Sequence, residues 1–128
     1  GPILNADVAK VCNRRKVPYS PGCGSASEIS YAEELGCEIV KVFPGSQVGG
    51  PEFIKAVMGP MPWTRIMPTG GVDPDEASVK AWFGAGIVAA GMGSKLITKA
   101  MLDAQDYKGI ENKVRDTVQL IKRVRGKA

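Results

Sequence analysis

Short apolar runs rich in β-branched residues alternate with helical patterns along this chain. The runs predict four strands, at residues 17–20, 38–43, 64–67 and 87–90. The strand starts lie 21, 26 and 23 residues apart, about the length of one strand, one helix and two loops. The alternation therefore predicts four successive β/α units, whose parallel strands are covered by helices.

Capping signals mark the ends of the helices between these strands. Asn5 is placed to cap a helix that runs to about Arg15, with Val8, Val11 and Cys12 on one face. The other signals are a capping box at Ser25 and Glu28, stops at Gly36, Gly59 and Gly84, Pro51 at a first helical position, a cap at Asp73-Pro74, a buried stripe of Val79, Trp82 and Phe83, and a last helix over 107–124.

The number of units leaves the architecture open. Four β/α units form either a small open sheet or half of an eight-stranded barrel. The chain opens on a helix, as expected if another strand preceded it. Its 128 residues suffice for one hydrophobic core and are too few for two, so we expect a single domain over residues 1–128.

Composition and charge argue against several classes of protein. No apolar run approaches the roughly 20 residues that span a bilayer, and no charged-then-apolar leader opens the chain. Three cysteines without C-x-x-C spacing, in a chain without histidine, argue against a metal site and favour reduced thiols in a cytoplasmic protein. Basic residues without interleaved aromatics predict a solvated helix face and no nucleic-acid partner. These are Lys113, Arg115, Lys122, Arg123, Arg125 and Lys127.

One lysine lies inside an apolar predicted strand. Lys41 is flanked by Val40 and Val42, so we expect its side chain to be buried. Burial disfavours an ammonium group and favours a free amine, which can attack a carbonyl to form a Schiff base. The alternative is a lysine at a frayed strand end with its amine in water.

Two glycine-rich turns follow the third and fourth predicted strands. They are 68–72 (Pro-Thr-Gly-Gly-Val), before the expected cap at Asp73, and 91–94 (Gly-Met-Gly-Ser), which opens a short helix. Glycine lets backbone N–H groups approach an anion, and a helix start adds a favourable dipole. The two turns together predict a phosphate site where strands end; a pure packing role for the glycines is the alternative.

Several motifs occur together along the chain in an order and spacing typical of one family. The chain resembles the class I aldolases that cleave 2-keto-3-deoxy-6-phosphogluconate and the related 4-hydroxy-2-oxoglutarate aldolases, over essentially all its residues. The motifs are 41–45 (Lys-Val-Phe-Pro-Gly), Gly49-Gly50-Pro51 with Phe53, Lys55 and Ala56, Gly59-Pro60, 68–72, and Gly91 with Gly93-Ser94.

The resemblance implies a (β/α)8 TIM barrel, of which this chain holds the carboxyl-terminal half: about four β/α units. It implies a lyase of the Entner–Doudoroff pathway. Such an enzyme makes or breaks a carbon–carbon bond next to pyruvate, without a cofactor. Its substrate is a small keto acid, and its assembly is a homo-oligomer, in this family usually a trimer.

The same resemblance assigns roles to residues. Lys41 forms the imine with the pyruvyl carbonyl, and the iminium acts as electron sink. Phe43 and Pro44 shape the wall beside the lysine. The phosphate or carboxylate of the substrate is held by Thr69, Gly70, Gly71, Gly93 and Ser94.

The family's proton-transfer group has no counterpart in this chain. The family's first strands carry an arginine that binds substrate and a glutamate that moves protons, and no residue here matches either. Glu38 lies three positions before Lys41, on the opposite strand face and toward the other end. Since a proton-transfer group contributes about 10²–10⁴-fold, we expect impaired activity from these residues alone.

Two other interpretations and the choice of substrate stay open. The chain could be a non-catalytic phosphate-binding half barrel. It could also be a fragment whose exposed strands serve assembly, with a second copy or with the missing half. The aldehyde product could be glyceraldehyde 3-phosphate, glyoxylate or that of a related sugar acid.

Overall fold

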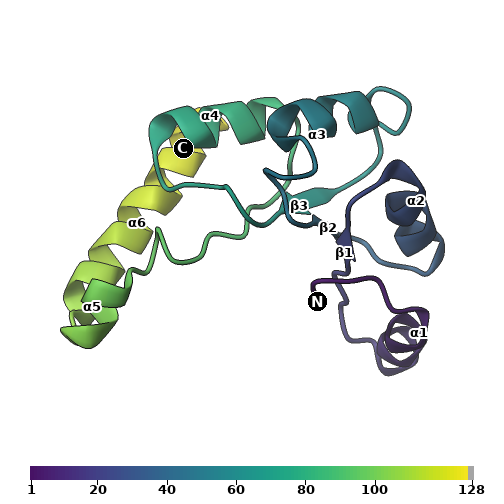
Figure 1. The fold of residues 1–128 in the computed structure, drawn as a ribbon, viewed down its shortest axis with the longest axis horizontal. Coiled ribbons are helices and arrows are strands. Elements are labelled where there is room, and N and C mark those ends of the chain that lie inside the picture. The colour runs from purple at the N-terminus through teal and green to yellow at the C-terminus, as the bar shows by residue number, and fades with distance from the viewer. Residues whose placement is uncertain (127–128) are drawn as a thin grey trace.

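The computed structural model describes residues 1–126, in which helices and parallel strands alternate as far as residue 84 and two further helices follow. One sheet has the strand order β1–β2–β3, and a helix follows each strand (Figure 1). This is an α/β partial barrel, as predicted. The strands are β1 (Gly22–Cys23), β2 (Val40–Val42) and β3 (Ile66–Pro68); the helices are α1 (Ala6–Arg15), α2 (Ala26–Glu34), α3 (Gly50–Met58), α4 (Glu76–Gly84), α5 (Lys99–Asp103) and α6 (Tyr107–Val124).

Short parallel ladders hold the sheet together. Gly22 of β1 pairs with Lys41 of β2, and Lys41 pairs with Met67 of β3. Residues paired in register across a sheet project to the same side. Gly22, Lys41 and Met67 therefore share one face, which we call the lysine face.

Helices α2 and α3 cover the opposite face of the sheet. Val40, Val42 and Ile66 are fully buried in one core with Ile29 of α2 and Ile54 of α3. In β2 and β3 the burial alternates along the strand, so the middle residues on the lysine face are only half-buried. The alternation follows from the two-residue period of a strand.

Most predicted helix ends are confirmed. The Asn5 side chain accepts hydrogen bonds from the N–H groups of Asp7 and Val8, both at 3.0 Å, and α1 ends at the expected arginine. Ser25 caps α2 by accepting from the Glu28 N–H at 3.2 Å. The last helix has the bounds that the periodicity predicted. These signals are local, so they hold whatever the helix packs against.

The predicted cap of α4 was wrong by two residues. Asp75 is the cap and accepts from the Ser78 N–H at 2.9 Å. Asp73 is held otherwise: its N–H donates to the Ser78 hydroxyl at 2.9 Å, and its carboxylate pairs with Lys95 at 2.5 Å. Both aspartates precede a helix, and only the loop geometry selects between them.

The face of α1 that carries Val8 and Val11 is largely exposed. Val8 and Val11 are 42% and 52% exposed, and α1 buries Ala9 instead. The stripe predicted on α4 is confirmed for Val79 and Trp82, which are 0% and 2% exposed.

The first predicted strand, 17–20, lies too early in the chain. Pairing begins at Gly22, and Val17 is 54% exposed. Pro18 and Pro21 have no N–H to donate to a ladder, and Pro21 contributes only its carbonyl, which accepts from the Lys41 N–H at 3.0 Å.

The fourth predicted strand, 87–90, forms no regular strand in the described structure, yet the chain there runs beside β3. The Val88 N–H donates to the Ile66 carbonyl at 3.0 Å, and the Gly91 N–H donates to the Pro68 carbonyl at 2.8 Å. A single parallel bridge joins Thr69 to Gly91. The fourth β/α unit is thus in its predicted place with a looser ladder.

The basic residues near the carboxyl terminus lie along or just after α6. Arg115, Lys122, Arg123 and Arg125 are exposed, as predicted for a solvated face, whereas Lys113 is half-buried. Lys127 lies outside the described residues. No helix in residues 1–126 is long and apolar enough to cross a membrane.

Candidate active site

Lys41 stands in the middle of β2 on the lysine face of the sheet. Its side chain is half-buried, so the expected burial is met only in part. Its apolar neighbours Val40 and Val42 point to the opposite face, where they are fully buried. Neighbouring residues in a strand face opposite sides of the sheet, so the apolar residues that flank Lys41 led to an overestimate of its burial.

Of the two residues predicted to form a wall beside Lys41, Phe43 contacts the amine and Pro44 is exposed. The Lys41 amine lies 4.7 Å from the centroid of the Phe43 ring. Phe43 is two residues further along the chain and therefore on the same side. An aromatic face at this distance attracts a cationic amine and provides an apolar surface next to it.

The carbonyl groups of Thr69, Gly70 and Gly71 are all held by protein donors. The Gly45 N–H donates to the Thr69 carbonyl at 2.8 Å. Ser46 donates twice to the Gly70 carbonyl, from its N–H at 3.0 Å and from its hydroxyl at 3.3 Å. The Trp82 indole N–H donates to the Gly71 carbonyl at 3.1 Å. The loop after β2 and helix α4 thus fix the loop after β3 through its carbonyl groups.

The N–H groups of the same loop are left for another ligand. Among the described residues, no acceptor binds the N–H groups of Gly70, Gly71 or Val72. Gly70 and Gly71 have φ angles of +92° and +76°, which favour glycine. Successive unpaired N–H groups in a turn make an anion-binding concavity. Helix α4 begins only at Glu76, so the helix dipole lies farther from this loop than predicted.

The second glycine-rich turn adjoins the first. An added Cβ at Gly91 would lie 2.2 Å from the Thr69 hydroxyl oxygen, so glycine permits the close approach of the two segments. Gly93 and Ser94 are exposed. Gly93 accepts from the N–H of Leu96 at 2.9 Å in a turn, and α5 starts only at Lys99, so the helix expected directly after Ser94 was wrong.

An ion pair ties the two turns together. The Lys95 amine lies 2.5 Å from the Asp73 carboxylate, which joins the residue after Ser94 to the end of the first turn. The hydrogen bond and the charge of Asp73 raise the pKa of Lys95. This pair, Ser46 and the indole of Trp82 were missed as site residues, because each acts through contacts distant in sequence.

The nearby thiol and carboxylates have structural roles. Cys23 is 1% exposed, and burial raises the pKa of its thiol to about 12, with a smaller contribution from the charge of Glu28. Glu28 accepts from the Gly24 N–H at 2.7 Å and from the Ser25 hydroxyl at 3.2 Å at the start of α2. The described residues contain no cluster of three or more cysteine, aspartate or glutamate side chains suited to a metal ion.

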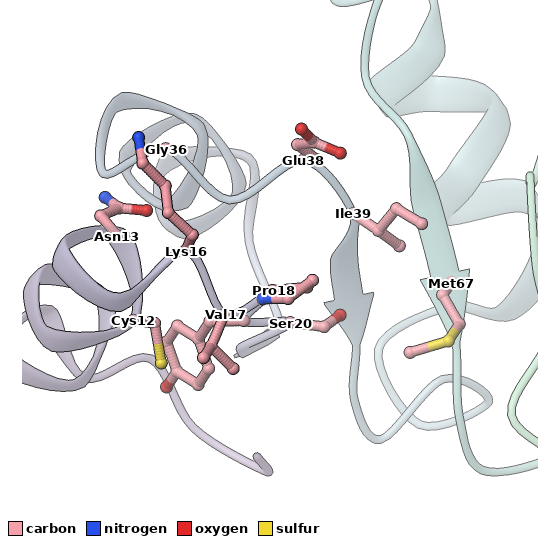
Figure 2. Close-up of a pocket in the computed structure, with 11 residues that line it drawn as sticks. Cys12, Asn13, Lys16, Val17, Pro18, Ser20, Gly36, Glu38, Ile39 and Met67 are labelled. Carbon is pink, nitrogen blue, oxygen red and sulfur yellow. The ribbon is translucent and has the colours of Figure 1, made fainter.

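A cavity of about 700 Å³ opens on the lysine face, toward the end of the sheet at which the strands begin (Figure 2). It is lined by Met67 of β3, by Ser20 and Ile39 in the segments just before β1 and β2, and by Lys16 after the end of α1. Glu38 lies on its margin, before β2 begins and away from the glycine turns. None of the predicted site residues lines this cavity. The candidate site is therefore the loop cluster and not the cavity.

A family model described as KDPG and KHG aldolase matches residues 1–113 of the chain. The chain is 31% identical over 121 residues to a 2-dehydro-3-deoxy-phosphogluconate aldolase of Haemophilus influenzae, which covers 94% of the chain and 56% of that relative. The chain thus spans about half the length of the curated relatives it matches.

Solved structures agree on the fold. A 4-hydroxy-2-oxoglutarate/2-dehydro-3-deoxyphosphogluconate aldolase from TTHB1 superposes with a TM-score of 0.77 at 29% identity, over 94% of this chain and 56% of that one. A KDPG aldolase of Legionella pneumophila, solved with pyruvate captured as a covalent carbinolamine, has a TM-score of 0.77 at 21% identity, over 94% and 55%. A protein cage designed by fusing symmetric oligomeric domains matches with a TM-score of 0.73 at 26% identity, over 98% and 47%.

Proposed function

The chain belongs to the KDPG and KHG aldolase family, and we propose that its protein is a class I aldolase. The reaction is cleavage of a 2-keto-3-deoxy-6-phospho sugar acid or of 4-hydroxy-2-oxoglutarate to pyruvate and an aldehyde. The observation that carries the proposal is the position of Lys41 on the strand whose following loop supports the Thr69–Gly71 turn. A nucleophilic amine and an anion-binding turn are thereby built into neighbouring strands.

In this proposal Lys41 is the nucleophile. Its neutral amine attacks the ketone carbon of the substrate to give a carbinolamine, which loses water to form an iminium ion. The iminium accepts the electron pair of the carbon–carbon bond as that bond breaks. The hydroxyl on the departing carbon gives its proton to water and becomes the carbonyl of the aldehyde, which leaves. Protonation of the resulting enamine and hydrolysis of the imine then release pyruvate and restore the amine. The Phe43 ring provides an apolar wall at the amine.

The proposed anion grip consists of the two turns. The free N–H groups of Gly70 and Gly71 favour a role in anion binding. Thr69, Gly93 and Ser94 are assigned to the same site on the family resemblance. Backbone N–H donors suit a phosphate group, which offers several acceptor oxygens. We propose a phosphorylated keto acid as the preferred substrate on this ground.

Proton transfer is the weak part of the machinery in these residues. Glu28 is engaged in capping α2, and Glu38 lies at the opposite end of the sheet. We therefore propose that these 128 residues alone turn over substrate about 10²–10⁴-fold more slowly than an enzyme with a positioned acid–base group.

Borohydride trapping with pyruvate, read by intact mass, tests the nucleophile. We expect a reduced pyruvyl adduct in the unmodified chain and none in Lys41→Ala. Lys55→Ala is the matched control, because Lys55 is exposed on α3 and pairs with Glu52 at 2.7 Å. An adduct that persists in Lys41→Ala, or no adduct in the unmodified chain at saturating pyruvate, would contradict the assignment.

A non-catalytic phosphate-binding role is the second candidate, and it is favoured by the same free N–H groups. Phosphate-dependent thermal stabilisation without any pyruvate adduct would select it. We further propose a single-domain unit over residues 1–128, a homo-oligomeric state as in the oligomeric domains of the cage, and a cytoplasmic location that suits the free thiols of Cys12, Cys23 and Cys37.

A further inference from the structure

The Gly70 carbonyl is held by both donors of one residue. Ser46 donates to it from the backbone N–H at 3.0 Å and from the side-chain hydroxyl at 3.3 Å. The hydroxyl occupies the space behind Gly71, because a Cβ added at Gly71 would lie 1.3 Å from it. The serine hydroxyl and the missing side chain of Gly71 therefore fit together.

The direction of a carbonyl sets the direction of the next N–H. A trans peptide unit is planar, and its C=O and N–H point to opposite sides. When Ser46 draws the Gly70 carbonyl toward the loop after β2, the Gly71 N–H is turned the other way. The bonds from Gly45 and from the indole of Trp82 act in the same manner on the neighbouring peptide units.

We propose that Ser46 is the positioning residue of the phosphate-binding turn and sets its preference for phosphorylated substrates. This inference rests on the proposed function, since it assumes that the turn binds a phosphate group. Ser46 is the one of the three donor residues that adds a side-chain hydroxyl from an exposed loop. It also lies five positions after Lys41, on the loop that continues the lysine strand, so the grip and the nucleophile share one support.

Ser46→Ala is the informative variant, because it keeps the backbone donor and removes only the hydroxyl. Titration with inorganic phosphate, followed by calorimetry, should show the dissociation constant rise about two- to tenfold, the effect of one hydrogen bond. Ser46→Thr retains a hydroxyl and should recover most of the affinity. Ser30→Ala, on the exposed side of α2, is the control and should bind phosphate like the unmodified chain.

The second measurement is pyruvate trapping, because pyruvate carries no phosphate. A positioning role predicts that Ser46→Ala loses more phosphate affinity than adduct yield, whereas general damage lowers both equally and overturns the proposal. Phosphate affinity in Ser46→Ala equal to that of Ser30→Ala overturns it too, as does failure of Ser46→Thr to recover. An unmodified chain that forms the pyruvate adduct but ignores phosphate overturns the grip and Ser46 together and leaves Lys41 as the nucleophile.

Discussion

Replacing Gly71 with alanine tests how tightly the two loops fit. The φ of +76° at Gly71 would cost an L-residue about 1–2 kcal/mol. The new Cβ would lie 1.3 Å from the Ser46 hydroxyl oxygen and 2.6 Å from the Ser46 Cβ, so the serine must leave the Gly70 carbonyl. The lost hydrogen bond adds about 0.5–1.5 kcal/mol. We expect Gly71→Ala to lower the free energy of unfolding by about 1.5–3.5 kcal/mol.

A double-mutant cycle separates the two contributions. In a Ser46→Gly background both crowding atoms are absent, so Gly71→Ala should cost only the backbone strain of about 1–2 kcal/mol. Ser46→Ala keeps the Cβ and should relieve the crowding incompletely. Urea unfolding with a common m-value for all variants gives the free energies. The reasoning would be refuted if Gly71→Ala cost the same in the presence and absence of the serine side chain.

Three further outcomes follow from the structure. Asn5→Ala should lower the free energy of unfolding by about 1 kcal/mol, measured by urea titration, because it removes the cap of α1; no change would contradict that cap. Trp82→Phe should lower the free energy of unfolding by about 1–3 kcal/mol and weaken phosphate binding, because it removes the indole donor and leaves a smaller ring in the core. An unchanged phosphate titration would show that the indole does not contribute to phosphate binding by the turn. A thiol reagent at pH 8 should modify half-buried Cys12 before buried Cys23, and equal labelling of both thiols would contradict the burial of Cys23. The free energy of unfolding should fall as pH rises above 9.0, because Cys23 ionises there in the unfolded chain while the folded thiol, with a pKa of about 12, stays protonated.

Most helix ends were predictable because their signals are local. The cap at Asn5 acts within three residues of chain, and the sequence contains all of it. The strand ends depend instead on which residues find partners. Gly22 is in β1 because it pairs with Lys41, and no pattern within residues 17–23 contains that information. The pattern therefore located each strand to within a few residues but did not predict its exact bounds.

The candidate site divides along the same line. Gly70 and Gly71 were proposed from a glycine-rich turn after a strand, and the structure gives both a left-handed backbone that favours glycine. Ser46 was not, because its partner Gly70 lies 24 positions away and the hydroxyl acts only after folding. The burial of Lys41 was overstated because its neighbours in sequence describe the helix-covered face of the sheet. Residues two positions away would have been the better guide to the lysine face.

The proposed anion grip and the proposed nucleophile have different surroundings, although β2 and the loop after it contribute to both. The proposed grip is the loop after β3, whose Gly70 and Gly71 carbonyls accept hydrogen bonds from Ser46 and Trp82, and all these contacts lie within the described residues. The proposed nucleophile, Lys41, lies on the lysine face, half-buried beside one aromatic ring. Reaction through a neutral amine is favoured where water is kept from the nitrogen. Phosphate affinity should therefore follow changes in the loops, and adduct yield should follow whatever covers the lysine face.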